Sequence, residues 1–225
     1  MVETQFITEG QGAVVSTHKV LRNTYLLLSM TLLFSAAMAG VAMVMEAPYM
    51  GWLPLIVAFA LLFAISKMRN SAWGILLVFA FTGILGFSLG PVVNLYMQTP
   101  GGTSTVVTAL SLTGVIFLSL SGYTLVSQKD FSYMHGFLMT GLWVVIGAIV
   151  LSFVGGFFGF HISGLQLAIS SAIVMLMSGL ILYDTSKIIH GGETNYIMAT
   201  VGLYLNIYNL FVSLLHIVGV FGGDD

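Results

Sequence analysis

The sequence predicts an all-α integral membrane protein, built as a bundle of seven transmembrane helices. Of the 225 residues, 58% are hydrophobic and only 6% are charged, whereas a soluble domain carries about 25% charged residues. Mean hydropathy is +1.03. The apolar residues form runs long enough to cross a hydrocarbon core of about 30 Å. The lipid bilayer is therefore the first expected partner.

The composition also excludes several classes of function. Net charge is −2, so the chain lacks the basic excess of a nucleic-acid-binding protein. It has no cysteine, which excludes disulfides and thiolate chemistry, and its five histidines show no metal-ligand spacing. We therefore expect no catalytic residues, no enzyme activity and no cofactor.

The spans follow from apolar runs separated by polar, glycine or proline breaks. Residues 1–17 are expected to form a mobile cytoplasmic tail, followed by a single transmembrane domain over residues 18–225. Glu46-Ala47-Pro48 ends the first span, and Gln98 to Gly102 forms a turn after the third. The predicted spans cover about residues 25–45, 51–66, 72–97, 105–126, 133–154, 164–188 and 196–221.

The second span is the shortest, so six spans with one buried hairpin is the alternative. Basic residues decide the orientation, because cytoplasmic loops carry excess lysine and arginine. With seven spans, all six basic residues fall on one side, and the other side carries Glu46, Asp224 and Asp225. This segregation predicts a cytoplasmic N-terminus and an external C-terminus.

The third span carries small residues on one helix face. Gly83, Gly86, Gly90 and Asn94 follow one another at spacings of three, four and four. Close helix packing explains the glycines better than a permeation path does. Pro91 should kink the span, because its ring clashes with a preceding carbonyl; Asn94 could then supply a partner to the freed carbonyl.

The sixth and seventh spans carry polar residues that cannot face lipid cheaply. Asn206, Asn209, Ser213 and His216 form a stripe on the seventh span, expected to face the bundle interior as packing contacts or as the lining of a pore. Asp184 lies near the end of the sixth span. It is either an interfacial carboxylate paired with Lys187 or a buried proton or cation site facing Asn206. Desolvation would favour its protonated form.

Several runs resemble the Bax inhibitor family of seven-span membrane proteins. They are Phe81-Thr82-Gly83-x-x-Gly86 through Gly90-Pro91, Tyr183-Asp184-Thr185, and Leu203 through Phe211. The runs from Ser16 to Tyr25 and from Ile189 to Ile197 are similar to its bacterial YccA-like branch. That resemblance implies an inner-membrane modulator and substrate of the FtsH quality-control protease, which would engage the N-terminal tail.

The resemblance also implies an alternative function. Other bacterial members are pH-sensitive calcium leak channels, in which two aspartates share a proton and an arginine latches to one of them. Asp184 matches the first aspartate, but Asn206 stands at the second and cannot ionise. The position of the latch arginine falls near Met68, so the neighbouring residues Lys67 and Arg69 are the candidates for the latch. Calcium would be the transported ion, with Asp184 as its only candidate metal ligand.

Overall fold

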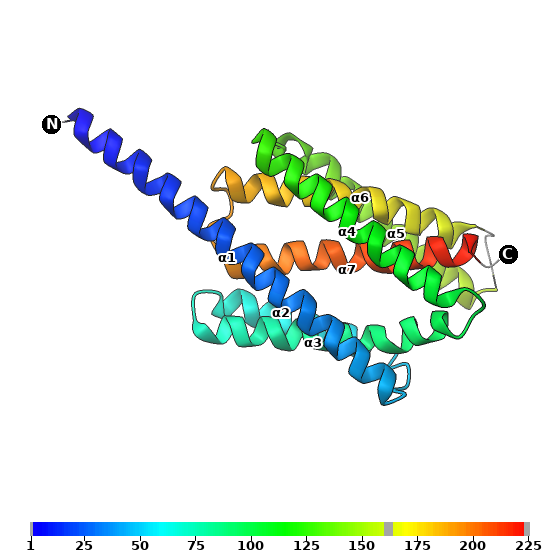
Figure 1. Cartoon of the computed structure of the whole chain (residues 1–225). Coiled ribbons are helices and arrows are strands. Elements are labelled where there is room, and N and C mark those ends of the chain that lie inside the picture. Colours follow the sequence, from blue (N-terminus) through cyan, green and yellow to red (C-terminus); the bar gives the residue numbers. More distant parts are fainter. Residues whose placement is uncertain (1, 160–163, 223–225) are drawn as a thin grey trace. The chain divides into compact units, whose positions relative to one another are not determined.

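All the regular secondary structure in the part of the chain that the structure describes is helical. This computed structural model describes residues 2–159 and 164–222, with side chains from Thr17 onward except that of residue 157. Within these ranges there are seven α-helices, one short 3-10 helix and no strands (Figure 1). The elements are α1 (Val2–Val44), α2 (Leu53–Met68), α3 (Ala72–Met97), α4 (Gly102–Ser127), η1 (Ser132–Met134), α5 (His135–Phe157), α6 (Leu165–Ile189) and α7 (Tyr196–Phe221).

The predicted spans correspond one to one with these helices. Six of the described helices are long and apolar enough to cross a membrane, while α2 has only 16 residues. At 1.5 Å per residue α2 measures roughly 24 Å, shorter than a hydrocarbon core of about 30 Å. The backbone of α1 is helical from Val2. Met1 and the side chains of residues 2–16 lie outside the description, so the mobile tail over residues 1–17 stays a prediction.

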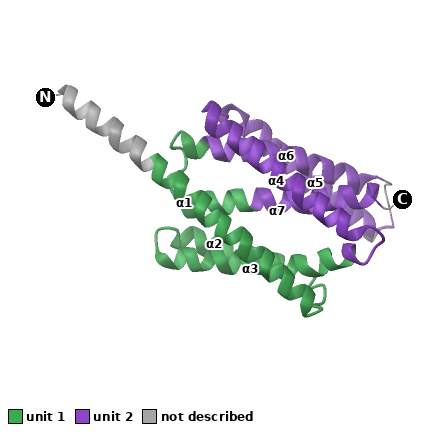
Figure 2. Cartoon of the chain, in the orientation of Figure 1, with its two compact units in different colours: residues 1–95, 187–204 green, residues 96–186, 205–225 purple. Residues whose placement is uncertain are grey.

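The helices group into two compact units (Figure 2). Unit 1 contains residues 1–95 and 187–204, and unit 2 contains residues 96–186 and 205–225. The helices α3, α6 and α7 each contribute residues to both units. This division concerns packing, and the prediction of one transmembrane domain over residues 18–225 stays a prediction.

In unit 1 the glycine face of α3 packs closely against α1. A Cβ on Gly90 would lie 2.7 Å from the carbonyl oxygen of Ala39, and one on Gly86 would overlap the carbonyl oxygen of Ser35. Only glycine allows two helix backbones to approach so closely. The packing interpretation of these glycines is confirmed. Pro91 lies inside α3, and the predicted kink at Gly90-Pro91 stays a prediction.

A buried tyrosine joins three helices of unit 1. Tyr204 is 1% exposed. Its hydroxyl lies 2.7 Å from the hydroxyl of Ser35 on α1 and donates to the carbonyl oxygen of Thr82 on α3 at 3.3 Å. A buried hydroxyl without partners would cost about 1–3 kcal/mol, so this network ties the first half of α7 to α1 and α3.

The loop between α6 and α7 is attached to the end of α2. Asn195 Nδ2 donates to the carbonyl oxygen of Arg69 at 3.0 Å and to Oδ1 of Asn70 at 2.9 Å. The Oδ1 atom of the same asparagine accepts from the backbone N–H groups of Ile197 and Met198. One side chain therefore caps α7, as asparagine does well, and holds the α2–α3 turn in place.

Candidate functional site

The carboxylate of Asp184 is bound directly to the amide of Asn206 inside unit 2. Asn206 Nδ2 donates to Asp184 Oδ2 at 2.7 Å, a short distance typical of a charge-assisted hydrogen bond. Asn206 is 6% exposed, while Asp184 is half-buried. The aspartate lies five residues before Ile189, the end of α6, which places it roughly 8 Å inside the helix. The two side chains form one polar site between α6 and α7.

A loop closes over the same end of α6. The hydroxyl of Ser186 accepts from the backbone N–H of Phe131 at 2.9 Å and donates to the carbonyl oxygen of Lys129 at 3.3 Å. Ser186 is 1% exposed. The α4–α5 connection is therefore anchored two residues from Asp184. No spacing in the sequence indicated this role for Ser186, because its partners lie more than fifty residues away.

Aromatic and basic side chains surround this anchor. The ring of His135, the first residue of α5, lies 5.4 Å from the ring of Tyr183 between centroids. Lys129 Nζ donates to the Tyr123 hydroxyl at 2.9 Å. That hydrogen bond raises the pKa of Lys129 above its ordinary value. Lys129 is exposed, so it stays a cation at neutral pH without adding much to stability.

The remaining residues of the predicted stripe on α7 do not share one environment. Ser213 is buried, and His216 Nδ1 lies 2.8 Å from the hydroxyl of Ser170 on α6. Asn209, by contrast, is exposed and donates to the carbonyl oxygen of Leu205 on its own helix. An asparagine can satisfy its donor within its own helix. The interior position predicted for Asn209 from spacing is therefore not the one that it occupies.

The other predicted residues belong to unit 1. Asn94 is half-buried on α3, and Gly90 packs against α1. Lys67 lies with its Nζ 5.1 Å from the centre of the Phe63 ring, and the carbonyl of Arg69 accepts from Asn195. The latch role of Lys67 or Arg69 stays a prediction.

The chemistry open to the site is that of one carboxylate held by one amide. Such a pair can bind a proton or contribute one ligand to a cation. It cannot share a proton between two acids, because an amide does not titrate. Within the described ranges, no group of three or more His, Asp or Glu residues could hold a metal ion. Calcium binds through six to eight oxygens, so Asp184 would supply only a small part of such a shell.

The ion pair of Lys187 bears on the interfacial interpretation of Asp184. Lys187 Nζ lies 3.8 Å from Oε2 of Glu193, with side chains 40% and 24% exposed. This pair lies in unit 1, where the α6–α7 loop begins. Lys187 therefore has a carboxylate partner other than Asp184. Asp184 is bound to Asn206 instead, as the buried-site interpretation requires.

Comparison with known proteins agrees with the resemblance seen in the sequence. The family model described as "Inhibitor of apoptosis-promoting Bax1" matches residues 17–223. An uncharacterized protein of Pseudomonas aeruginosa is 49% identical over 92% of this chain and 91% of its own length. An Escherichia coli K12 protein named "Modulator of FtsH protease YccA" is 46% identical over 96% of this chain and 97% of its own. Another Escherichia coli strain has a relative named "Inner membrane protein YccA" with the same identity and coverage. The chain therefore belongs to the Bax inhibitor family.

Proposed function

We propose that this chain is an inner-membrane modulator and substrate of the FtsH protease. The observation that carries the proposal is its 46% identity to the Escherichia coli protein named as modulator of that protease, over nearly the whole of both chains. The named function comes from that relative. We assign the chain no catalytic activity and no cofactor.

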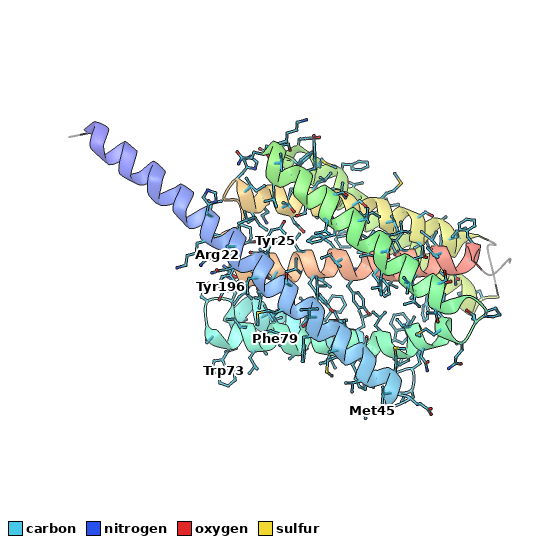
Figure 3. The ribbon with its side chains drawn as sticks, in the orientation of Figure 1. Arg22, Tyr25, Met45, Trp73, Phe79 and Tyr196 are labelled. Atoms are coloured by element: carbon cyan, nitrogen blue, oxygen red, sulfur yellow. The ribbon has the colours of Figure 1, made fainter. Side chains whose placement is uncertain are left out.

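The topology that we propose has seven spans, with α2 as the shortest and the N-terminus in the cytoplasm. The packing of unit 1 supports it. Arg22 and Tyr25 on α1 lie beside Tyr196 at the start of α7 (Figure 3), and Thr200 of α7 donates to the carbonyl oxygen of Thr24. Asn195, one residue before α7, binds the end of α2.

Residues 19–25 of α1, the end of α2, and the last turn of α6 with the α6–α7 loop therefore lie at one end of unit 1. Five of the six basic residues belong to these segments: Lys19, Arg22, Lys67, Arg69 and Lys187. If α2 did not cross the membrane, this end would combine segments from both faces. A single cytoplasmic end with excess positive charge follows when α2 does cross.

The mechanism that we propose is slow competition for the protease. An ATP-dependent protease that engages the tail must pull apolar helices out of the bilayer against the cost of exposing their surface to water. Glycine packing and the Tyr204 network resist the separation of the helices in unit 1. A substrate that is engaged readily and extracted slowly occupies the protease for longer, so other substrates wait.

Deletion of residues 2–15 should lengthen the half-life of the protein and leave a tighter brake on the protease. The reason is that the proposed engagement point is lost, while the membrane domain, which we propose also contacts the protease, remains. Pulse-chase in cells with FtsH measures the half-life, and turnover of a second membrane substrate measures the brake.

The control for this deletion replaces residues 2–15 with a glycine–serine segment of equal length. If the protease engages any tail of this length, the replaced protein should keep the natural half-life. If the protease requires the natural tail sequence, the replaced protein should have a longer half-life, as the deletion does. The proposal fails if deletion leaves both the half-life and the turnover of the second substrate unchanged.

A second candidate function is a pH-sensitive calcium leak, and the hydrogen-bonded Asp184–Asn206 pair favours it. A carboxylate inside a span marks an ion or proton path more often than a packing contact. In proteoliposomes, calcium flux should then change with pH, and Asp184→Asn should flatten the response because the titrating group is gone. Asp130→Asn, in the α4–α5 connection, is the matched control. Purified wild-type protein without calcium flux at any pH would reject this candidate.

A further inference from the structure

Unit 1 contains an apolar groove that no role of the Asp184 site uses. The groove has a volume of about 640 Å³ and is formed by α1, α2, α3 and the α1–α2 connection. Small-molecule sites typically measure about 300–1,000 Å³. Gly83 is one of its lining residues, and a Cβ there would lie 2.8 Å from the ring of Phe34. The groove therefore has the size of a ligand site.

The lining of the groove selects an apolar occupant. Phe34, Phe79 and Phe87 line it together with methionine, leucine and proline side chains, and almost no polar atom reaches its surface. Phe34 and Phe79 meet edge to face, with ring centroids 5.5 Å apart. These residues lie within the candidate spans Thr17–Val44 and Ala72–Met97. At this depth the surrounding medium is hydrocarbon, so an acyl chain can enter the groove without losing hydration.

The groove is also too small for a transmembrane helix. A helix with its side chains is about 10–12 Å in diameter, which a volume of about 640 Å³ does not hold over several turns. A single flexible acyl chain fits better. Filling the groove would restore dispersion contacts that its lining otherwise lacks.

We expect one end of the groove to lie at a membrane interface. Met50 and Leu53 line that end, next to Tyr49 and Trp52, which are 76% and 60% exposed. Exposed tyrosine and tryptophan are typical of the headgroup level. Met45, the first residue of the α1–α2 connection, and Trp73, near the start of α3, mark opposite ends of unit 1 (Figure 3).

The charge at this end of the groove distinguishes between lipid headgroups. Over residues 36–58 and 84–95, which lie towards this end of unit 1, Glu46 is the one charged residue. It is exposed. A lone carboxylate repels phosphatidylglycerol and other anionic headgroups and attracts an ammonium group.

We propose that the groove binds one acyl chain of an amine-bearing zwitterionic phospholipid, such as phosphatidylethanolamine, whose ammonium group lies at Glu46. The site is independent of the proposed action on the protease. A lipid held there fills the space between α1 and the α2–α3 hairpin, so that the short helix α2 packs on α1 and α3 through it.

Tryptophan quenching by brominated lipids tests the proposal. One variant places the reporter in the groove (Phe87→Trp, with the native tryptophans 52, 73 and 143 changed to phenylalanine). The reference protein keeps only Trp143, which is 71% exposed on α5. Both are reconstituted in mixtures of phosphatidylethanolamine and phosphatidylglycerol in which one of the two lipids is brominated. At the groove we expect an about threefold preference for the amine lipid, the ratio that one exposed ion pair produces, and no preference at Trp143.

Three further variants locate the site. Ala80→Leu should remove the preference, because Ala80 lines the groove and the larger side chain projects into the space that the acyl chain would occupy. Ala60→Leu, at an exposed position of α2 that does not line the groove, should leave the preference unchanged. Glu46→Gln should abolish the preference while the groove reporter is still quenched. Equal ratios at the groove and at Trp143 would overturn the proposal, as would a preference that survives Ala80→Leu.

Discussion

The variant Asn206→Asp should lose more stability than the natural protein as pH rises. It places a second carboxylate at the position where Asn206 Nδ2 now lies 2.7 Å from Asp184 Oδ2. Two carboxylates at that distance cannot both ionise cheaply, so the folded pair retains one proton that the unfolded chain has already released. Because the folded state then binds more protons than the unfolded state, stability falls with increasing pH.

The size of this effect is limited by one proton. A difference of one bound proton changes stability by about 1.4 kcal/mol per pH unit, so the maximum between pH 5 and pH 8 is about 4 kcal/mol. We expect roughly half of that or more, measured as the loss of thermal stability in detergent or nanodiscs across this pH range. Asp184 is half-buried, and water near it will reduce the repulsion.

The control exchanges the two side chains. In the double variant Asp184→Asn with Asn206→Asp, one carboxylate again faces one amide, and the pH dependence should return to that of the natural protein. If the exchanged pair is as sensitive to pH as the single variant, the proximity of the two carboxylates is not the cause.

The variant Gly86→Ala should lower stability by about 1–3 kcal/mol, the usual cost of overpacking a close contact. A Cβ at this position would overlap the carbonyl oxygen of Ser35 on α1. Backbone atoms cannot turn away as a side chain can, so α1 and α3 must move apart. The hydroxyl contact between Ser35 and Tyr204, now 2.7 Å, would stretch at the same time.

Gly40→Ala is the matched control for this substitution. Gly40 lies on α1 in the same unit, and a Cβ there would meet nothing within 4 Å. Alanine is a better helix former than glycine by about 0.5–1 kcal/mol, so this variant should be as stable as the natural protein or slightly more stable. Thermal melting of both variants under one set of conditions makes the comparison. If the Gly86→Ala variant has the same melting temperature as the Gly40→Ala variant, the close packing of α1 on α3 is contradicted.

The positions of the helices could be predicted closely from the sequence. The spans expected at residues 72–97 and 196–221 coincide with α3 and α7, and those at 105–126 and 164–188 differ from α4 and α6 by at most three residues at either end. The reason is local. A backbone in hydrocarbon must satisfy its own hydrogen bonds, so every long apolar run becomes a helix, and Pro48, Gly101 or a charged residue marks where a run ends.

The candidate site was only partly predictable. Asp184 stood out because a charge in an apolar run is costly, and Asn206 because of its place in the polar stripe. Spacing alone put Asn209 on the same face as Asn206, yet Asn209 bonds to its own helix and is exposed. Ser186 and Ser170 were missed, since their partners are distant in sequence.

By itself, then, the sequence determined a helical membrane protein, its family, and a single acidic residue near the end of the sixth span. The tertiary structure decided which partner that residue has. Hydropathy acts on each segment separately and fixes where helices form. A hydrogen bond such as that between Asn206 and Asp184 depends on the rotation and offset of two packed helices, which no run of residues encodes alone. The same holds for Gly86 against Ser35, where the close approach of two backbones shows why the small residue is needed.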